Sequence, residues 1–226
     1  MFQLAIEDTW RQAYPHASAG VLVMSDVENP DNHASLENRI QYLEGELRSQ
    51  YAGKDRTALA ALPTLQAYNA YYKPYKKTFH VQLQLESLVM KGRLIPRVSA
   101  LVSAMFIAEL TNLLLTAGHD LAKVDGPVRL EAARGDEIYT TLQGAEKTLK
   151  PGDMFMADHQ GIISSVLYGP DARTRITSHT RAVVFTVYAP KGIPVALVRS
   201  HLEEICDHVR LFSLGAQVEK LELYTA

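Results

Sequence analysis

Histidine and acidic side chains occur at a spacing that suits metal chemistry near the end of the chain. His201, Glu204 and His208 follow one another at intervals of three and four residues. A helix would therefore place two imidazoles and a carboxylate on one face, where they could bind a metal ion. Because such sites are usually completed by a ligand from a second element, a solvated polar helix face is the simpler interpretation. We predict no metal and no other cofactor.

Two further polar clusters occur in the second half of the chain. His119 and Asp120 precede Asp125 just after an apolar segment, and functional and capping roles both remain open for them. The pair Asp158-His159 stands where a predicted strand gives way to a turn, which favours a turn role. The chain has no phosphate-binding glycine loop, no Gly-x-Ser-x-Gly motif, no paired cysteines and no His-Glu-x-x-His motif.

Basic side chains gather in two windows that could follow a phosphate backbone. Three tyrosines are interleaved with the first window and could stack on bases. The alternative interpretation is a solvated, lysine-rich loop whose tyrosines cover the core. The first window contains Lys73, Lys76, Lys77, Lys91, Arg93 and Arg97, with Tyr71, Tyr72 and Tyr75, and the second contains Arg173, Arg175 and Arg181.

Composition limits the classes of protein that fit. The 226 residues are 47% hydrophobic and carry a formal net charge of -2, so any contact with RNA must rest on a local basic patch. One cysteine cannot form an internal disulfide, and the N-terminus reaches an acidic residue at Glu7 without a signal-peptide pattern. The longest apolar stretch is too short to span a membrane. We expect a cytoplasmic protein.

The helices and strands that must position these residues are predicted from the spacing of apolar residues and from glycine and proline stop signals. Apolar spacing and stop signals predict a buried strand at 20–24, an amphipathic helix to about residue 51, and a helical piece at 57–72 that is interrupted near Pro63. A short helix at 84–90 and a long, buried helix at 97–116 follow, with Gly118 as the stop signal of the second.

From Pro127 onward the pattern changes to short strands separated by turns, at 128–132, 138–142, 154–157, 162–167 and 182–188. A final helix at 194–212 and an edge strand at 218–224 complete the chain. Helices early and strands late favour an α+β fold over a doubly wound parallel sheet. The absence of repeats and flexible linkers indicates one domain over 1–226.

An ordered series of segments between Pro96 and Pro190 resembles a known family. It consists of Glu-Leu-Thr-Asn at 109–112, Gly-His-Asp at 118–120, Val-Asp-Gly at 124–126, Lys-Pro-Gly-Asp at 150–153 and Thr-Ser-His-Thr-Arg at 177–181. The series resembles the B3/4 editing domain of the phenylalanyl-tRNA synthetase β subunit, in its free-standing, single-domain version. Residues 1–62 would be an N-terminal elaboration, and 193–226 a C-terminal helix and strand.

The resemblance implies an α+β module with a layered sheet core and a pocket for an aminoacyl group. In the synthetase this domain hydrolyses tyrosine wrongly attached to phenylalanine tRNA and tests for the phenol hydroxyl. Thr111, Asn112, Gly118 and Asp125 match substrate-binding positions of the family, and Val166 is expected to contact the substrate in the same pocket.

Three positions depart from the family pattern. The family histidine aligns with Ala122, although His119 lies one short turn away. Ser165 and Val166 replace two glycines, and Thr186 stands where the synthetase has its hydroxyl-sensing glutamate.

Two functions of different classes follow from the resemblance. The first is an aminoacyl-tRNA deacylase acting in trans, in which Ser164, Ser165 and Thr186 hold a water against the ester and His119 is the one candidate base. The second is a non-catalytic module that binds an amino acid, a small metabolite or a tRNA end. A purely structural role is the remaining alternative. Either function requires a cavity between the helix end at 111–112 and the strand at 164–166.

Overall fold

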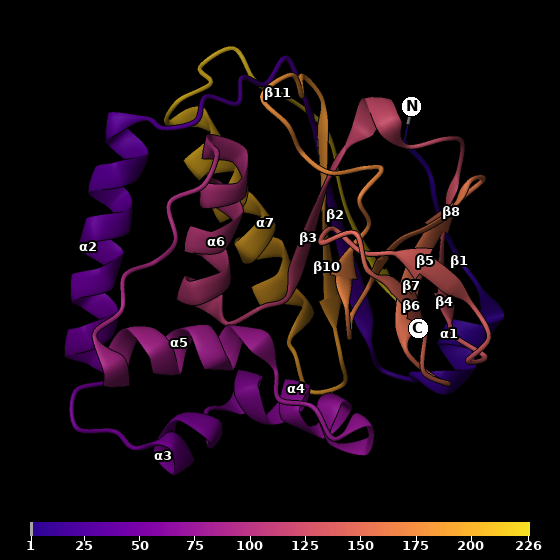
Figure 1. Cartoon of the computed structure of the whole chain (residues 1–226), viewed down its shortest axis with the longest axis horizontal. Helices are drawn as coiled ribbons and strands as arrows, with labels where there is room; N and C mark the ends of the chain where they lie inside the picture. Colours follow the sequence, from indigo (N-terminus) through magenta and orange to yellow (C-terminus); the bar gives the residue numbers. More distant parts are fainter. Residues whose placement is uncertain (1) are drawn as a thin grey trace.

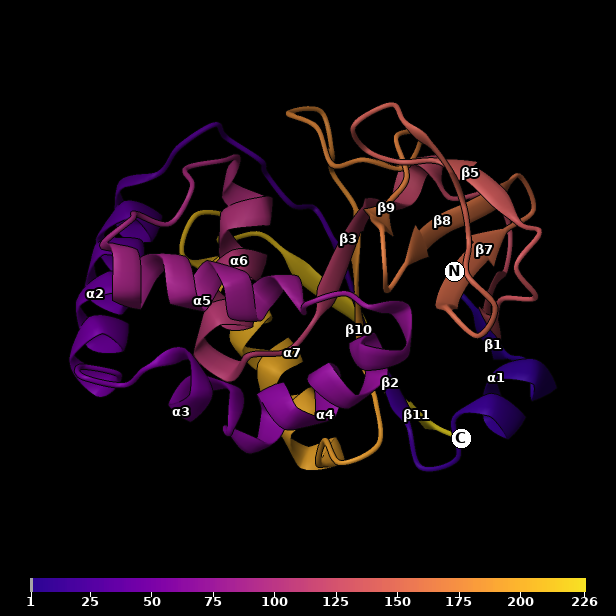
Figure 2. The same cartoon turned by 60° about the horizontal axis from the view of Figure 1, so that its bottom comes forward.

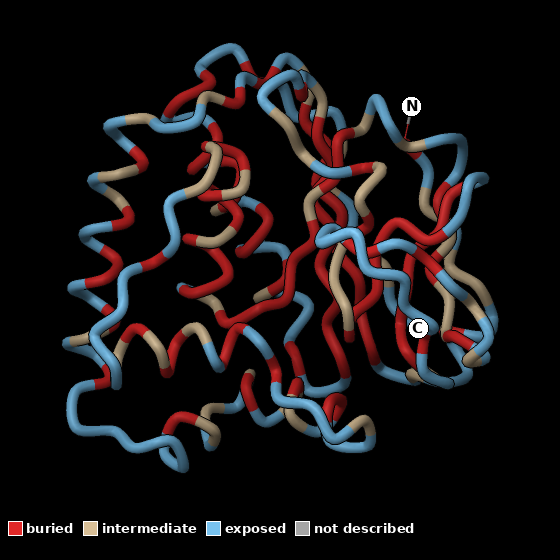
Figure 3. Tube along the Cα trace, in the orientation of Figure 1, coloured by how far each residue is buried: buried red, intermediate tan, exposed pale blue. Residues whose placement is uncertain are grey.

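The protein is built in three layers, in which helices cover one face of a four-stranded sheet and a second sheet covers the other (Figures 1 and 2). The structure, a computed structural model, describes residues 2–226. Apolar side chains from both sheets and from the helices form one large buried cluster, and the buried segments lie where the layers meet (Figure 3). The predicted α+β fold with a layered sheet core is confirmed.

The four-stranded sheet has the order β11-β2-β10-β3, with every neighbouring pair antiparallel. Its strands are β2 (Ser18–Ser25), β3 (Thr116–Asp120), β10 (Val183–Ala189) and β11 (Gln217–Thr225). Every residue of β10 is buried, and so is every residue of β2 except the last, because helices and the second sheet cover opposite faces of the sheet. Continuous apolar sequence is typical of strands covered on both faces.

The five-stranded sheet has the order β1-β4-β7-β8-β9, in which only the β1–β4 pair is parallel. Its strands are β1 (Leu4–Ile6), β4 (Val128–Ala132), β7 (Met154–Asp158), β8 (Gly161–Ser165) and β9 (Gly169–Pro170). A separate hairpin joins β5 (Ile138–Thr140) to β6 (Glu146–Thr148).

Helices α6 (Ala100–Asn112) and α7 (Val195–Arg210) pack against the four-stranded sheet, and α2 (Ala34–Gln50) packs outside α6 (Figure 1). The remaining helices are α1 (Asp8–Ala13), α3 (Arg56–Ala60), α4 (Pro63–Tyr72) and α5 (His80–Lys91), with short 3₁₀ turns η1 (Lys73–Tyr75) and η2 (Leu121–Lys123). No helix among the described residues is long and apolar enough to cross a membrane.

The central helix is shorter than its sequence predicts. The apolar run predicts a helix to residue 116, but α6 ends at Asn112 because Leu113 adopts a left-handed conformation with φ of 58°. Its amide still bonds to the Glu109 carbonyl at 2.7 Å, and the chain then enters β3 at Thr116. Apolar composition alone does not distinguish a buried helix from a buried strand, so the boundary was missed. Gly118 and His119 therefore lie in a strand, not after a helix.

The N-terminal region is more than a cover for the rest of the fold. β2 lies between β11 and β10, in the interior of the four-stranded sheet. Residues 1–62, expected to be an elaboration, thus supply an interior strand on which β10 and β3 depend for their position.

Candidate functional site

A largely apolar cavity of about 420 Å³ opens between α5, α6, β3 and the loop after β8. This volume lies within the range of roughly 300–1,000 Å³ that is usual for small-molecule sites. Its lining consists of His80, Gln84, Val102, Met105, Phe106, Glu109, Thr116, Ala117, Gly118, Leu142, Gln143, Val166, Leu167, Tyr168, Gly169, Pro170, Arg175 and Ile176.

One face of α6 forms a wall of this cavity. Val102, Met105, Phe106 and Glu109 are spaced by three, four and seven residues, which places them on one side of a helix. The bend at Leu113 then returns the chain past its own helix, so that β3 runs beside this face. The cavity is therefore enclosed by two segments that are close neighbours in the sequence.

Glu109 is the carboxylate of this wall, and its side chain is buried. The Thr116 amide donates a hydrogen bond of 2.8 Å to Glu109 Oε1, and no other hydrogen bond or ion pair reaches the carboxyl group from residues 2–226. Burial raises the pKa of Glu109 to about 8, against the opposing effect of the Thr116 amide. At neutral pH Glu109 is therefore mostly protonated and able to ionise when a positive group approaches.

The sequence interpretation did not select Glu109 as a site residue, although a signal existed. It is the one charged residue between positions 98 and 115, and it shares a helix face with apolar residues. A lone acid on an apolar face is rarely left without a partner in a folded protein.

Buried tyrosines hold the opposite wall of the cavity in place. Tyr72 donates a hydrogen bond of 2.7 Å to the Val166 carbonyl, and Tyr71 donates one of 2.8 Å to Asp153 Oδ1. The same Asp153 oxygen accepts from the Leu167 amide at 3.3 Å. Burial raises the pKa of Asp153 to about 7. Tyr71 and Tyr72 thus cover the core, and their rings are not free to stack on bases.

The rim of the cavity carries positive charge. Arg175 is exposed, lines the cavity, and makes no ion pair with any residue of the described chain. Lys77 is also exposed, and its ammonium lies 4.4 Å from the ring centroid of Tyr168, which lines the cavity. A carboxyl group inside the cavity, a cation in its lining and a second cation against the Tyr168 ring make the site electrically asymmetric.

The predicted catalytic residues lie outside the cavity lining. Ser164 shares a hydrogen bond with the Tyr188 hydroxyl, and Ser165 Oγ accepts one of 3.1 Å from the Tyr168 amide. Thr186 is fully buried, and its hydroxyl donates to the Ala117 carbonyl at 3.5 Å. These three side chains belong to the packing between the two sheets and to the support of the loop after β8.

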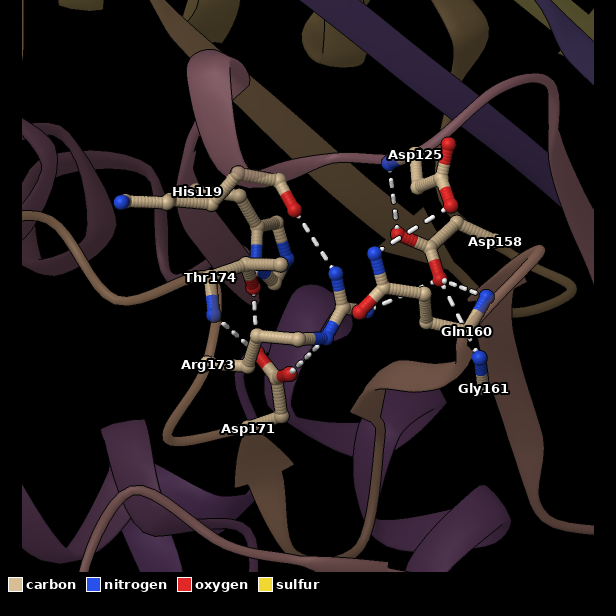
Figure 4. A network of polar contacts seen from close by, with 9 residues as sticks. His119, Asp125, Asp158, Gln160, Gly161, Asp171, Arg173 and Thr174 are labelled. Atoms are coloured by element: carbon tan, nitrogen blue, oxygen red, sulfur yellow. Dashed lines mark hydrogen bonds and ion pairs between the residues drawn. The ribbon is translucent and has the colours of Figure 1, made fainter.

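His119, the fourth predicted catalytic residue, is fully buried in a polar network (Figure 4). Its Nδ1 lies 2.8 Å from Thr174 Oγ1, and the Thr174 hydroxyl proton is directed to Asp171. His119 Nδ1 must therefore carry the proton in this bond, and Nε2 has no partner within residues 2–226. Burial lowers the pKa of His119 to about 4, so the ring is neutral at neutral pH.

Arg173 and Asp125 belong to the same network (Figure 4). The Arg173 guanidinium contacts Asp158 at 2.8 Å and the Lys123 carbonyl at 2.7 Å, with Asp171 at 3.7 Å. Asp158 also accepts from the Asp125 amide at 2.9 Å. Neither Arg173 nor Asp125 lines the cavity. The charge of Arg173 is satisfied within the fold, which leaves little of it for a phosphate.

The other predicted substrate-binding residues divide into two groups. Gly118 and Val166 line the cavity. Thr111 donates to the Ile107 carbonyl at 2.8 Å within its own helix, and Asn112 donates to Glu204 Oε2 on α7 at 2.6 Å. The expected apposition of 111–112 with 164–166 is therefore wrong in detail. The face of α6 that ends at Glu109 meets the cavity, and the last two residues of α6 turn away from it.

The remaining predicted RNA-binding residues do not form one patch. Arg97 makes ion pairs with Glu37 and Glu44, so its charge is used within the fold. Arg181 donates to the Ser178 and Thr180 carbonyls. Lys73, Lys76 and Arg93 are exposed, but none of them lines the cavity.

The face of α7 with His201, Glu204 and His208 is not solvated, which corrects the sequence interpretation. His201 and His208 are both buried. His201 Nε2 lies 2.7 Å from Thr116 Oγ1, so a hydroxyl–imidazole pair stands at the cavity wall. Burial lowers the pKa of His201 to about 3. Within residues 2–226 no three His, Cys, Asp or Glu side chains are arranged to hold a metal ion.

Comparisons with known proteins point in one direction. A family model described as "B3/4 domain" matches residues 66–222. The phenylalanine–tRNA ligase beta subunit of Mycoplasma pneumoniae is 36% identical over 69 residues, which cover 30% of this chain and 9% of that protein. A crystal structure of an N-terminal fragment of the phenylalanyl-tRNA synthetase beta subunit from Pyrococcus horikoshii has a similar fold, with a TM-score of 0.51 at 12% identity. That match covers 100% of this chain and 55% of the fragment.

Proposed function

The chain belongs to the B3/4 domain family, and on that premise we propose that it recognises the aminoacyl end of a charged tRNA, with the aminoacyl group inside the cavity beside α6. The observation that carries this proposal is the cavity itself, which has about 420 Å³ of space and a largely apolar lining. An apolar enclosure with a few polar groups is typical of sites that bind small, partly apolar ligands.

The charges at the rim support a ligand whose outer part is anionic. Arg175 is free of ion pairs with the described residues, and Lys77 lies over the Tyr168 ring at the same cavity. The ribose-phosphate of a tRNA end would lie there while the aminoacyl group fills the interior. Because the net charge of the chain is -2, such an interaction depends on these local cations and weakens with added salt.

Binding is tested with stable mimics in which an amide replaces the aminoacyl ester. A panel of tRNAs carrying different amino acids in amide linkage, each compared with the same tRNA uncharged, should give at least one charged form that binds tenfold or more tightly. Equal binding of charged and uncharged tRNA throughout the panel would reject the proposal.

Hydrolysis of a mischarged aminoacyl-tRNA in trans is a second candidate, favoured by the Thr116–His201 pair at the cavity wall. A neutral imidazole 2.7 Å from a hydroxyl can orient that hydroxyl or accept its hydrogen bond. The depressed pKa of His201 makes the ring a weak base, so the main catalytic effect would be positioning of the ester and of water.

This second candidate has its own measurement. Loss of amino acid from a panel of mischarged tRNAs should be faster with the protein than without it, and Thr116→Val should reduce the rate while leaving the binding of amide mimics in place. If the protein did not accelerate hydrolysis of any charged tRNA above the uncatalysed rate, the hydrolytic function would be rejected and binding would stand as the function.

A further inference from the structure

We propose that Glu109 is the specificity-determining residue of the cavity and forms an ion pair with the α-ammonium group of an aminoacyl ligand. This inference rests on the proposed function, because it names the group by which the same cavity selects its ligand. Glu109 is the one charged residue of the α6 face that lines the cavity.

The Glu109 carboxyl group is incompletely hydrogen-bonded within the fold. Oε1 accepts from the Thr116 amide at 2.8 Å, while nothing in the described chain donates to Oε2. Oε2 is not fully enclosed by protein atoms, although it has no hydrogen-bond partner. Because Glu109 lines the cavity, this oxygen faces the cavity space. A carboxyl group that faces an apolar cavity in this way can accept a further hydrogen bond only from a molecule that enters the cavity.

The groups around Glu109 determine which kind of donor fits its free oxygen. The titratable groups around Glu109 are Tyr68 and Tyr72 on α4, His201 on α7, which contacts Thr116, and His80 on α5, which lines the same cavity. Burial raises the pKa of both tyrosines and lowers the pKa of His201 to about 3 and that of His80 to about 4, so all four are neutral near pH 7 and none supplies a positive charge. An ionised Glu109 therefore needs a cation from outside the fold. A primary ammonium is compact enough for a site whose other walls are apolar.

The distribution of charge around the cavity determines the direction in which the ligand must lie. Positive charge lies on exposed Arg175 in the cavity lining and on Lys77 beside Tyr168, whereas negative charge becomes available on the buried side chain of Glu109. A ligand with its ammonium inside and an anionic or ester end outside matches this order, and one that enters with a carboxylate first does not. Like charges placed together would cost several kcal/mol by order of magnitude.

The experiment compares pairs of probes that differ only at the α position. Methyl esters of alanine, leucine, methionine and phenylalanine carry an ammonium, and methyl esters of the corresponding α-hydroxy acids carry a hydroxyl of similar size. Calorimetric titration of the full chain at pH 6.5 should show at least one amino ester that binds tenfold or more tightly than its hydroxy partner. Binding should also release protons, because Glu109 loses its proton as it pairs with the ammonium.

Variants assign the preference to Glu109. Glu109→Gln keeps the shape and the hydrogen bond from Thr116 but cannot ionise, so the preference for the amine and the proton release should both disappear. Glu109→Asp keeps the charge and should retain part of the preference. The matched control is Glu86→Gln, since Glu86 is a buried acid of α5 that is bonded to Arg56 and Gln82 and does not line the cavity. This control should leave the preference unchanged.

Titration with free amino acids is the last part of the experiment, because it distinguishes a free amino acid from an aminoacyl ester as the molecule that carries the ammonium group. Tight binding of free amino acids would identify the free molecule as the ligand, and binding of esters alone would identify an aminoacyl ester; both agree with the ion pair. Equal affinity for amino and hydroxy esters, or a preference that survives Glu109→Gln, overturns the inference while the binding function stands. If no probe and no charged-tRNA mimic binds, the proposed function itself falls and the inference falls with it.

Discussion

Two buried carboxyl groups of this protein, Asp158 and Glu109, lie in opposite electrostatic situations. Asp158 is surrounded by donors: Arg173 at 2.8 Å and the amides of Asp125 at 2.9 Å, Gln160 at 2.9 Å and Gly161 at 3.2 Å. Glu109 has one amide donor, no cation, and an open cavity in front of it. Both side chains are removed from bulk water, but only the first has its charge satisfied by the fold.

The difference separates a structural role from a binding role. A fully bonded buried ion pair fixes the positions of the elements that supply its donors, here η2, the β7–β8 turn and the loop after β9. A buried acid with one oxygen that lacks a hydrogen-bond donor contributes little to stability. It is a good recognition group, because a ligand can supply the missing donor or positive charge. Chemically reactive residue types are present in both regions, so residue type alone does not identify the site.

The largest effect should come from breaking the satisfied network. Arg173→Met removes the guanidinium and leaves Asp158 buried without its counter-ion, which should lower the free energy of unfolding by about 3 kcal/mol. The midpoint of thermal unfolding should fall by roughly 6–12 °C. Arg134→Met is the matched control, because that arginine is 82% exposed and its ion pairs are at 3.7 and 3.8 Å. Similar small losses for both variants would mean that the network is not structural.

The second effect concerns Glu109 and depends on pH. In the folded state Glu109 keeps its proton up to about pH 8, whereas in the unfolded chain it ionises around its ordinary pKa of 4.5. The unfolded state therefore binds fewer protons between these values, and stability falls as pH rises through that window. Glu109→Gln removes this loss, so the variant should gain on the order of 3 kcal/mol of unfolding free energy relative to the unsubstituted chain between pH 5 and pH 8.

Chemical denaturation of both chains at pH 5, 6, 7 and 8 measures this difference. Asp153, whose pKa is raised to about 7, contributes in the same range but equally to both chains, so it cancels in the comparison. Two pH profiles that run parallel would show that Glu109 ionises in the folded state as it does in the unfolded one.

The sequence predicted the layers of this fold better than it predicted the site. Continuous apolar runs located the strands at 20–24 and 182–188, because burial on both faces leaves a clear signal in one segment. The end of α6 was missed, since the apolar run continues through Leu113–Leu115 into β3 and only the backbone shows the left-handed turn.

The placement of His119, Ser164 and Thr186 could not be inferred from the sequence for a different reason. Their partners are Thr174, Tyr188 and Ala117, which lie 55, 24 and 69 positions away. Such pairings depend on strand register and on which face each side chain occupies, and a shift of one residue would reverse the faces. Glu109, by contrast, could have been identified as a site residue from the sequence, because a lone charge on an apolar helix face is visible there.

A smaller effect should follow from filling space beside the cavity. A Cβ at Gly118 would lie 2.9 Å from Ile176 Cδ1 and 3.3 Å from the Phe185 ring, so Gly118→Ala must displace Ile176, which lines the cavity. We expect a loss of about 1 kcal/mol in unfolding free energy and weaker binding of the largest amino ester. Gly45→Ala, in α2 with no atom near the new methyl, should instead stabilise the chain by roughly 0.5–1 kcal/mol. If Gly118→Ala stabilised the chain instead, Ile176 would be able to move aside without an energetic cost, and the cavity would not be rigid at this wall.

The smallest effect on stability, and the sharpest contrast with Arg173, is expected for Arg175. These two arginines lie two positions apart, but Arg173 is bound within the network while Arg175 is exposed at the cavity rim. Arg175→Gln should therefore change the unfolding free energy by less than about 0.5 kcal/mol. If Arg175 contacts a phosphate of the ligand, the same change should weaken tRNA binding and reduce the slope of log affinity against log salt by about one. Fluorescence titration at several salt concentrations measures that slope. An unchanged slope with unchanged stability would place the nucleic acid elsewhere and restrict the cavity to the aminoacyl group alone.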